Sequence, residues 1–165
     1  MAFLNFRDTG SVNEAVLPGS VKITTEHVFV SSGGAVYGDT VEIPTREDTV
    51  CNPISPYGIH KLTFEKYLNY YYKVFGQKYI ALRPANVYGP RQFKEGEAGV
   101  ISIFVDNAMA GKKSQITGTG TQTRDFVYVG DVVEALVKAS ETDFVGEVNI
   151  STGRESNLLQ VIESL

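Results

Sequence analysis

The chain has 165 residues, a mass of 18.1 kDa and a formal net charge of −4. This length predicts one domain or a large part of one, and a hydrophobic share of 42% supplies a core and excludes intrinsic disorder. The negative charge, without any run of Lys or Arg, argues against a general nucleic-acid surface. No apolar run approaches the roughly 18 residues of a membrane span, and the first residues lack the pattern of a signal peptide.

Cysteine and histidine are too sparse for a disulfide framework or a metal site. The lone cysteine, Cys51, cannot form an internal disulfide, and it fits a reducing, cytoplasmic setting. His27 and His60 have no close cluster of acidic or thiol ligands, so no metal site is predicted. Residues 1–26 mix glycine, proline and scattered apolar residues without a period. We treat them as an atypical N-terminal segment with one or two weak elements at most.

From residue 27 the chain alternates strand-like and helix-like segments. The apolar, β-branched run 27–31 predicts a buried strand that ends in a loop at Ser32-Gly33-Gly34. The stretch 44–56, rich in Pro, Asp and Thr, predicts a loop. The periodic segment 57–75 predicts a helix that ends at Gly76.

The second half continues this alternation. We predict a strand over 78–82 that Pro84 stops, and a helix over 99–110 capped by Gly111. A strand over 125–129 follows, then a helix over 132–140 with Asp131 as its N-cap. A strand over 147–150 precedes a helix that begins at Asn157 and runs to the end of the sequence. Strands that alternate with helices predict the α/β class, with a mainly parallel sheet and helices on its faces.

Within the predicted helix, Tyr57 and Lys61 stand four residues apart. Side chains at i and i+4 share one helix face, so the phenol and the ammonium project together. A nearby cation favours the phenolate and lowers the pKa of a tyrosine from its usual value of about 10, which suits a general acid/base. The alternative is two unconnected residues on an amphipathic helix, and the pair alone does not decide between these interpretations.

Five segments then follow one another in order: 29–38 (FVSSGGAVYG), 55–61 (SPYGIHK), 82–92 (LRPANVYGPRQ), 118–131 and 149–153 (NISTG). Each is weak by itself, but the ordered set is specific. Together they resemble the extended short-chain dehydrogenase/reductases of the NAD-dependent epimerase/dehydratase family, and within it the UDP-glucose 4-epimerase group. The resemblance implies a partial, truncated Rossmann-like domain over residues 27–165, together with elements of the substrate-binding region.

The resemblance also implies roles for individual residues. Tyr57 would take the proton of a UDP-sugar hydroxyl as hydride moves to NAD, while Lys61 tunes Tyr57 and bonds the nicotinamide ribose. A hydroxyl after the first strand would share the substrate proton. The spacing of 25 residues before Tyr57 assigns it to Ser32, whereas alignment on the VYG at 36–38 places Gly33 there. We favour Ser32, and the alternative is a strand-terminal serine that bonds local backbone.

Two further positions correspond to substrate contacts in the family. Asn86 stands where the substrate pyrophosphate binds, and the alternative for it is a turn-former. Arg124 matches an arginine that pairs with UDP phosphates, a role that suits a guanidinium fork, and the alternative is a solvated ion pair with Asp125. A structural role fits Arg83. In the family the helix 57–75 packs across a dimer two-fold, which implies a homodimer.

One family feature has no counterpart in the sequence. Members begin with a Gly-x-x-Gly-x-x-Gly turn that holds the NAD pyrophosphate, and no such turn occurs here. We therefore expect the chain to be inactive by itself. Two alternatives stay open: a non-catalytic fragment or scaffold that self-associates or binds nucleotide weakly, and a dehydratase or reductase of the superfamily. Dehydratases carry acidic residues where this chain has Gly33-Gly34, which favours the epimerase.

Overall fold

The computed structural model describes residues 27–40, 43–92 and 99–165, so the predicted N-terminal segment lies outside the described residues. The elements follow in the order β1 (His27–Val30), α1 (Gly33–Tyr37), α2 (Pro56–Phe75), β2 (Tyr79–Pro84), β3 (Asn86–Tyr88), α3 (Val100–Met109), β4 (Thr123–Arg124), β5 (Phe126–Tyr128), α4 (Val129–Ser140), β6 (Gly146–Ile150), β7 (Ser156–Asn157) and α5 (Leu158–Glu163). No helix in these ranges is long and apolar enough to cross a bilayer.

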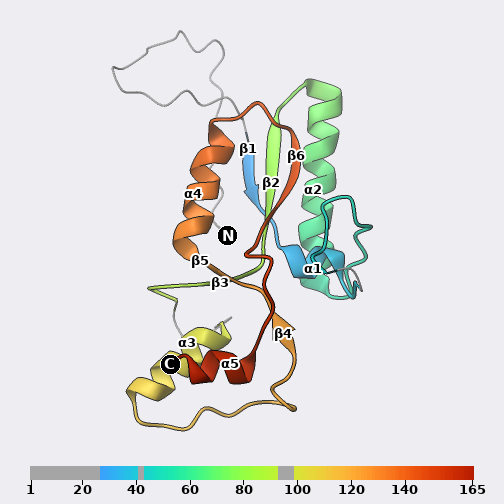
Figure 1. Cartoon of the computed structure of the whole chain (residues 1–165). Coiled ribbons are helices and arrows are strands. Elements are labelled where there is room, and N and C mark those ends of the chain that lie inside the picture. Colours follow the sequence, from blue (N-terminus) through green and yellow to red (C-terminus); the bar gives the residue numbers. More distant parts are fainter. Residues whose placement is uncertain (1–26, 41–42, 93–98) are drawn as a thin grey trace, which may run out of the picture.

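The main sheet is parallel and three-stranded, in the order β1-β2-β6. All six residues of the central strand β2 are buried, as a parallel strand covered on both faces requires. Helix α2 covers one face of the sheet and α4 covers the other (Figure 1). The predicted α/β class, with a parallel sheet and flanking helices, is confirmed.

Alternation along the strands divides the core in two. On the α2 face, Leu68 packs with Tyr79 and Ala81, and the rings of Phe29 and Phe64 stack with centroids 4.5 Å apart. On the α4 face, the buried residues are Ile80, Leu82 and Ala139. Successive residues of β2 thus serve opposite faces, which fixes the register of the sheet.

Beyond the carboxyl ends of the main sheet lie two smaller strand pairs (Figure 1). β3 pairs in parallel with β5, and β4 pairs with β7 in antiparallel orientation. Helices α3 and α5 lie on this side of the molecule. The strand predicted over 125–129 is present as β5, but it is one residue shorter at each end, because Asp125 separates it from β4 and Val129 already starts α4.

Two predicted strand endings also differ from the structure. Pro84 does not stop β2 but is its last residue, paired with Ile150. β1 ends opposite Leu82, before Pro84 is reached, and the amide of Ala85 donates to Ile150 O. The missing N–H of Pro84 therefore breaks no hydrogen bond of the sheet. After β1, the predicted loop at Gly33-Gly34 is instead the first turn of α1.

Helix boundaries were predicted best where local signals agree. α2 ends at Gly76 with φ 73°, as predicted. Asn157 caps α5 in a capping box with Gln160, but the helix ends at Glu163 rather than running on. Asp131 is not the N-cap of α4, because that position is Tyr128, and Asp131 lies in the first turn, where an acidic side chain suits the helix dipole.

The short helix α1 packs closely on the start of α2. Gly58 makes this approach possible, because a Cβ there would overlap the carbonyl oxygen of Ala35 and lie 2.9 Å from Cβ of Pro53. In α1 itself, a Cβ on Gly34 would meet no atom within 4 Å. The two helical glycines therefore differ in what they do for packing.

We expect Gly58→Ala to destabilise the chain by about 1–3 kcal/mol, since the backbone of α1 must move to admit the methyl group. The matched control, Gly34→Ala, is expected to raise the free energy of unfolding by about 0.5–1 kcal/mol through the better helix propensity of alanine. Urea unfolding followed by circular dichroism measures both. Equal effects of the two substitutions would contradict the proposed close approach.

Candidate active site

Tyr57 and Lys61 lie in the first two turns of α2. The start of the helix is fixed by Ser55, whose Oγ accepts a hydrogen bond of 3.1 Å from Gly58 N, with Pro56 in the first turn. Lys61 Nζ lies 5.5 Å from the centre of the Tyr57 ring, so the two groups face the same side. The Tyr57 side chain remains 49% exposed, so a ligand has access to the phenol.

Lys61 is held against the end of β1. Its Nζ donates a 2.9 Å hydrogen bond to the carbonyl oxygen of Val30 and lies 5.1 Å from the centre of the Phe29 ring. Partial burial lowers the pKa of Lys61 from its usual value of 10.5. The carbonyl takes one of the three ammonium donors, which leaves two for a ligand.

The strand end next to this lysine carries two serines. Ser31 is 3% exposed, whereas Ser32 is half-buried and takes the N-cap position of α1 with an extended backbone. The Ser32 side chain makes no capping bond to the helix. Gly33 lies against the end of β2, where a Cβ would approach Arg83 O to 3.2 Å. Ser32 is thus the more accessible hydroxyl of the two, and its catalytic role stays a prediction.

A cavity of about 290 Å³ opens beyond the carboxyl ends of the sheet. Its lining comes from four parts of the chain: α1 and the loop after it, the β2–β3 junction, β4, and the turn after β6. Of the predicted site residues, Asn86 and Arg124 line the cavity. Ser32, Tyr57 and Lys61 do not, although Gly33, the neighbour of Ser32, does. The structure therefore places the predicted residues in two groups.

The cavity presents cationic and amide groups. Arg124 and Arg154 both line it, and Arg124 donates a 2.7 Å hydrogen bond to the carbonyl oxygen of Thr123. Asn86 is the first residue of β3, and its amide nitrogen donates to Asp125 O at 3.2 Å. Two acidic residues, Asp125 and Glu155, also line the cavity, and the Glu155 carboxylate accepts a 2.7 Å bond from Thr123 Oγ1.

Asp125 has a different role from the ion pair considered for it. Its carboxylate accepts hydrogen bonds from the backbone nitrogen of Thr152, at 3.0 and 3.1 Å, from Thr152 Oγ1 at 2.9 Å and from Gly153 N at 2.8 Å. These bonds fix the turn after β6 against the junction of β4 and β5. Arg124, the residue before it, is thereby left on an exposed edge of the cavity.

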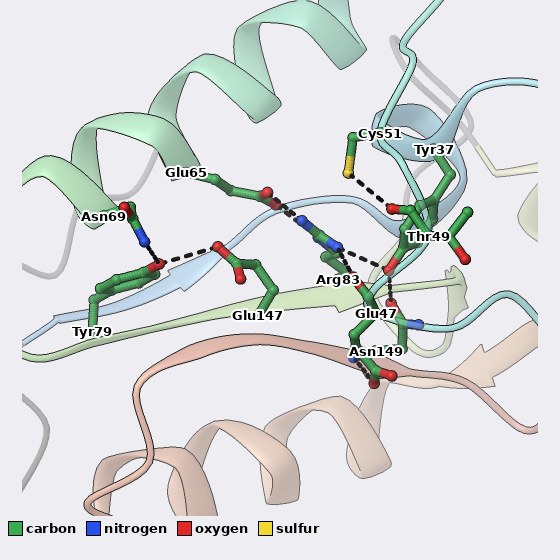
Figure 2. A network of polar contacts seen from close by, with 10 residues as sticks. All are labelled: Tyr37, Glu47, Thr49, Cys51, Glu65, Asn69, Tyr79, Arg83, Glu147 and Asn149. Atoms are coloured by element: carbon green, nitrogen blue, oxygen red, sulfur yellow. Dashed lines mark hydrogen bonds and ion pairs between the residues drawn. The ribbon is translucent and has the colours of Figure 1, made fainter.

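The wall of the cavity is continuous with a buried polar network (Figure 2). Arg83 forms a bidentate ion pair with Glu65 of α2, with Nε–Oε1 at 3.1 Å and Nη2–Oε2 at 2.7 Å. The remaining nitrogen, Nη1, donates to the hydroxyl of Tyr37 at 2.9 Å, and this hydroxyl donates to Asn149 Oδ1 at 2.8 Å. The backbone nitrogen of Asn149 in turn donates to Glu47 Oε1 at 3.0 Å.

Burial and pairing both act on the ionisation of this network. Burial lowers the pKa of Arg83, but its hydrogen bonds to Glu65 and Tyr37 more than offset that effect, so the pKa lies above its usual value. The guanidinium therefore stays charged. Burial raises the pKa of Tyr37, with the bond from Arg83 acting in the opposite direction. The Tyr37 hydroxyl is accordingly a neutral link between a cation and an amide.

Sequence reasoning anticipated a structural role for Arg83 but missed its partners. Glu65 follows Lys61 by four residues and Tyr57 by eight, so it continues the same helix face into the core. A carboxylate on the buried stripe of a helix was therefore the available signal. Tyr37 and Asn149 both lie in segments that carry the family resemblance, but no local pattern predicts their contacts, because these join residues 46 and 112 positions apart.

Residues 5–151 match the NAD dependent epimerase/dehydratase family. The UDP-glucose 4-epimerase of Mycolicibacterium smegmatis is 46% identical over 131 residues, which are 79% of this chain and 42% of that protein. The chain thus spans less than half the length of the curated relatives it matches.

Solved structures give the same result. The UDP-glucose 4-epimerase of Thermotoga maritima, crystallised with UDP-glucose, superposes with a TM-score of 0.79 at 47% identity, over 82% of this chain and 44% of that one. The UDP-glucose 4-epimerase of Thermus thermophilus in complex with NAD gives a TM-score of 0.76 at 39% identity, over 83% and 46%. The fold described above is therefore shared with roughly half of each of these proteins.

The lowered pKa of Lys61 has a testable effect on stability. Between its folded-state pKa and the unfolded-state value of about 10.4, the unfolded chain binds more protons than the folded chain. The free energy of unfolding gains a contribution that rises with pH through this window. Lys61→Met lacks this contribution. We therefore expect its free energy of unfolding, relative to that of the parent, to be highest at neutral pH and to fall towards pH values of about 11.

Urea unfolding of parent and Lys61→Met at several pH values measures this difference. Lys113→Met controls for the loss of one positive charge at an exposed position outside α2. A difference between Lys61→Met and the parent that stays constant with pH would show that the Lys61 ammonium is not desolvated at this position.

Proposed function

Because the chain belongs to the NAD dependent epimerase/dehydratase family, we propose that it is the catalytic and substrate-binding portion of a UDP-sugar 4-epimerase acting on a substrate such as UDP-glucose. The observation that carries this proposal is the cavity at the carboxyl edge of the sheet, lined by Asn86 and Arg124. In parallel α/β sheets, ligands bind at this edge. A guanidinium and an amide suit the two phosphates of a nucleotide sugar.

The acid/base part of the proposal rests on the start of α2. Tyr57 takes the proton from the sugar hydroxyl, and the Lys61 ammonium lies beside it, 5.5 Å from the centre of its ring. Ser32 supplies a hydroxyl that hydrogen-bonds the same substrate oxygen. Its side chain suits this role because it makes no capping bond to α1.

The cofactor that the family implies is NAD, which supplies the hydride acceptor when bound. In the chain itself, the half-exposed Tyr57 and the two remaining donors of Lys61 fit the hydroxyls of the nicotinamide ribose. The sequence contains no glycine turn for the pyrophosphate. We therefore propose that this chain by itself binds the UDP-sugar more readily than NAD and does not turn over.

Isothermal titration calorimetry with UDP and with NAD tests the proposal. We expect binding of UDP, and we expect Arg124→Gln to weaken it by about 10- to 100-fold, the equivalent of one charge-assisted hydrogen bond. Lys138→Gln, which removes a positive charge from the exposed Glu134–Lys138 pair of α4, is the matched control and should bind as the parent does.

Each calorimetric result separates the candidates. UDP binding that depends on Arg124 supports the substrate-binding portion. Absence of UDP binding would favour the alternative of a non-catalytic scaffold. Equal losses in Arg124→Gln and Lys138→Gln would show that only net charge attracts the nucleotide and would contradict a phosphate site at Arg124.

We further propose that the chain forms a homodimer through α2. The outer face of this helix exposes large aromatic residues, including Tyr67 at 59% and Tyr70 at 51%. Exposed aromatic surface of this kind is typical of interfaces. In static light scattering we expect the parent to have the mass of a dimer and the double variant Tyr67→Glu, Tyr70→Glu that of a monomer.

The control is Val133→Glu, which places the same charge on an apolar residue of α4, 53% exposed on the opposite side of the sheet. This variant should remain dimeric. A monomeric parent, or dissociation of Val133→Glu, would rule out α2 as the interface.

A further inference from the structure

The residue stripe on α2 joins the proposed acid/base pair to the buried ion pair. Tyr57, Lys61 and Glu65 follow at four-residue intervals, so they lie one above the other on the same helix face. The first two lie at the accessible end of this stripe, and Glu65 is 1% exposed. Any contact that fixes Glu65 therefore also fixes the height and rotation of the helix that carries Tyr57 and Lys61.

The contact that fixes Glu65 has a demanding geometry. Two parallel hydrogen bonds of 3.1 and 2.7 Å join its carboxylate to the guanidinium of Arg83, which is 4% exposed. A two-point pairing of planar groups restrains both sliding and rotation, which a single bond does not. In a buried site no water replaces either partner if the pair separates.

The same guanidinium reaches the ligand cavity with its other edge. Its Nη1 donates to Tyr37, whose hydroxyl donates to Asn149, and all three residues line the cavity (Figure 2). Arg83 thus contacts the helix of the acid/base pair on one side and the wall of the proposed substrate site on the other.

We propose that Arg83 is a positioning residue, which couples the placement of Tyr57 and Lys61 to the shape of the ligand cavity through Glu65 on one side and Tyr37 on the other. The inference rests on the proposed function in one respect, that the cavity takes the UDP-sugar. The coupling itself is a property of the free protein. A displacement of α2 is therefore accompanied by a displacement of the cavity wall at Tyr37, and the reverse.

The chain offers a matched pair of variants to test this coupling. Tyr37→Phe removes the hydroxyl that links Arg83 to Asn149 of β6. Tyr79→Phe removes a comparable hydroxyl, which accepts from Asn69 of α2 and donates to Glu147 of β6, both at 3.1 Å. This hydroxyl does not hydrogen-bond Arg83, and Tyr79 does not line the cavity. Both variants delete one oxygen from a tyrosine that is at most 4% exposed.

The readout is the Tyr57 ring signal in NMR spectra of protein with ¹³C-labelled tyrosine, assigned with Tyr57→Phe. In the ligand-free protein we expect Tyr37→Phe to move or broaden this signal and to speed amide exchange in the first two turns of α2. Tyr79→Phe should leave both as in the parent. Arg83→Lys, which keeps the charge beside Glu65 but lacks the fork, should act as Tyr37→Phe does.

A titration with UDP adds the ligand. In the parent we expect UDP to shift the Tyr57 signal, and in Tyr37→Phe we expect at least a two-fold smaller shift at saturation, while Tyr79→Phe retains the full shift. An unchanged Tyr57 signal in Tyr37→Phe, equal changes in both tyrosine variants, or a Tyr37→Phe chain that does not fold would overturn the coupling. Failure of the parent to bind UDP would refute the proposed function alone, because the ligand-free comparison would still decide the coupling.

Discussion

The buried pair of Glu65 and Arg83 is the constraint on which the arrangement of this chain depends. Two opposite charges at 1% and 4% exposure have lost almost all their water, so each relies on the other. Removing one partner from such a pair typically costs about 3–5 kcal/mol, although replacing both with apolar groups is often neutral. The pair therefore contributes a defined position of α2 on the sheet rather than net stability. Its two hydrogen bonds restrain the height and the rotation of α2 on the sheet more closely than apolar packing, which tolerates small slips.

The position of α2 matters because the two groups of predicted site residues come from different elements. Tyr57 and Lys61 depend on α2, while Asn86 and Arg124 depend on β3 and β4 beyond the edge of the main sheet. The second group is held by separate contacts. β3 pairs with β5, and the carboxylate of Asp125 binds the turn after β6. The sheet joins the two groups through β2, which carries Arg83 within it and leads directly into Asn86.

Features that depend on neighbours in sequence were predictable. The common face of Tyr57 and Lys61 follows from helical periodicity, and the cap at Asn157 follows from its pairing with Gln160 three residues on. Features that depend on distant partners were not. Asp131 has the residue type of an N-cap, but β5 continues directly into α4 and the N-cap is Tyr128. Pro84 has the residue type of a strand end, but it is tolerated in β2 because β1 ends opposite Leu82. Strands of two or three residues, such as β4 and β7, carry no pattern of their own and exist only through pairing.

The steps of the proposed function need different groups of residues. Recognition of phosphate needs a cation and donors held in place, and here Asn86 donates to Asp125 O and Arg124 donates to Thr123 O. The proposed proton transfer needs Tyr57 and Lys61 at a fixed place relative to the proposed phosphate site, and the hydrogen bonds of Arg83 to Glu65 and Tyr37 are the connection that we propose for this purpose. Hydride transfer needs a cofactor held by its pyrophosphate, and the sequence has no glycine turn for that purpose. In the proposed function, the substrate-binding and acid/base groups therefore come from this chain, while the NAD pyrophosphate would need a glycine turn that the given sequence does not contain.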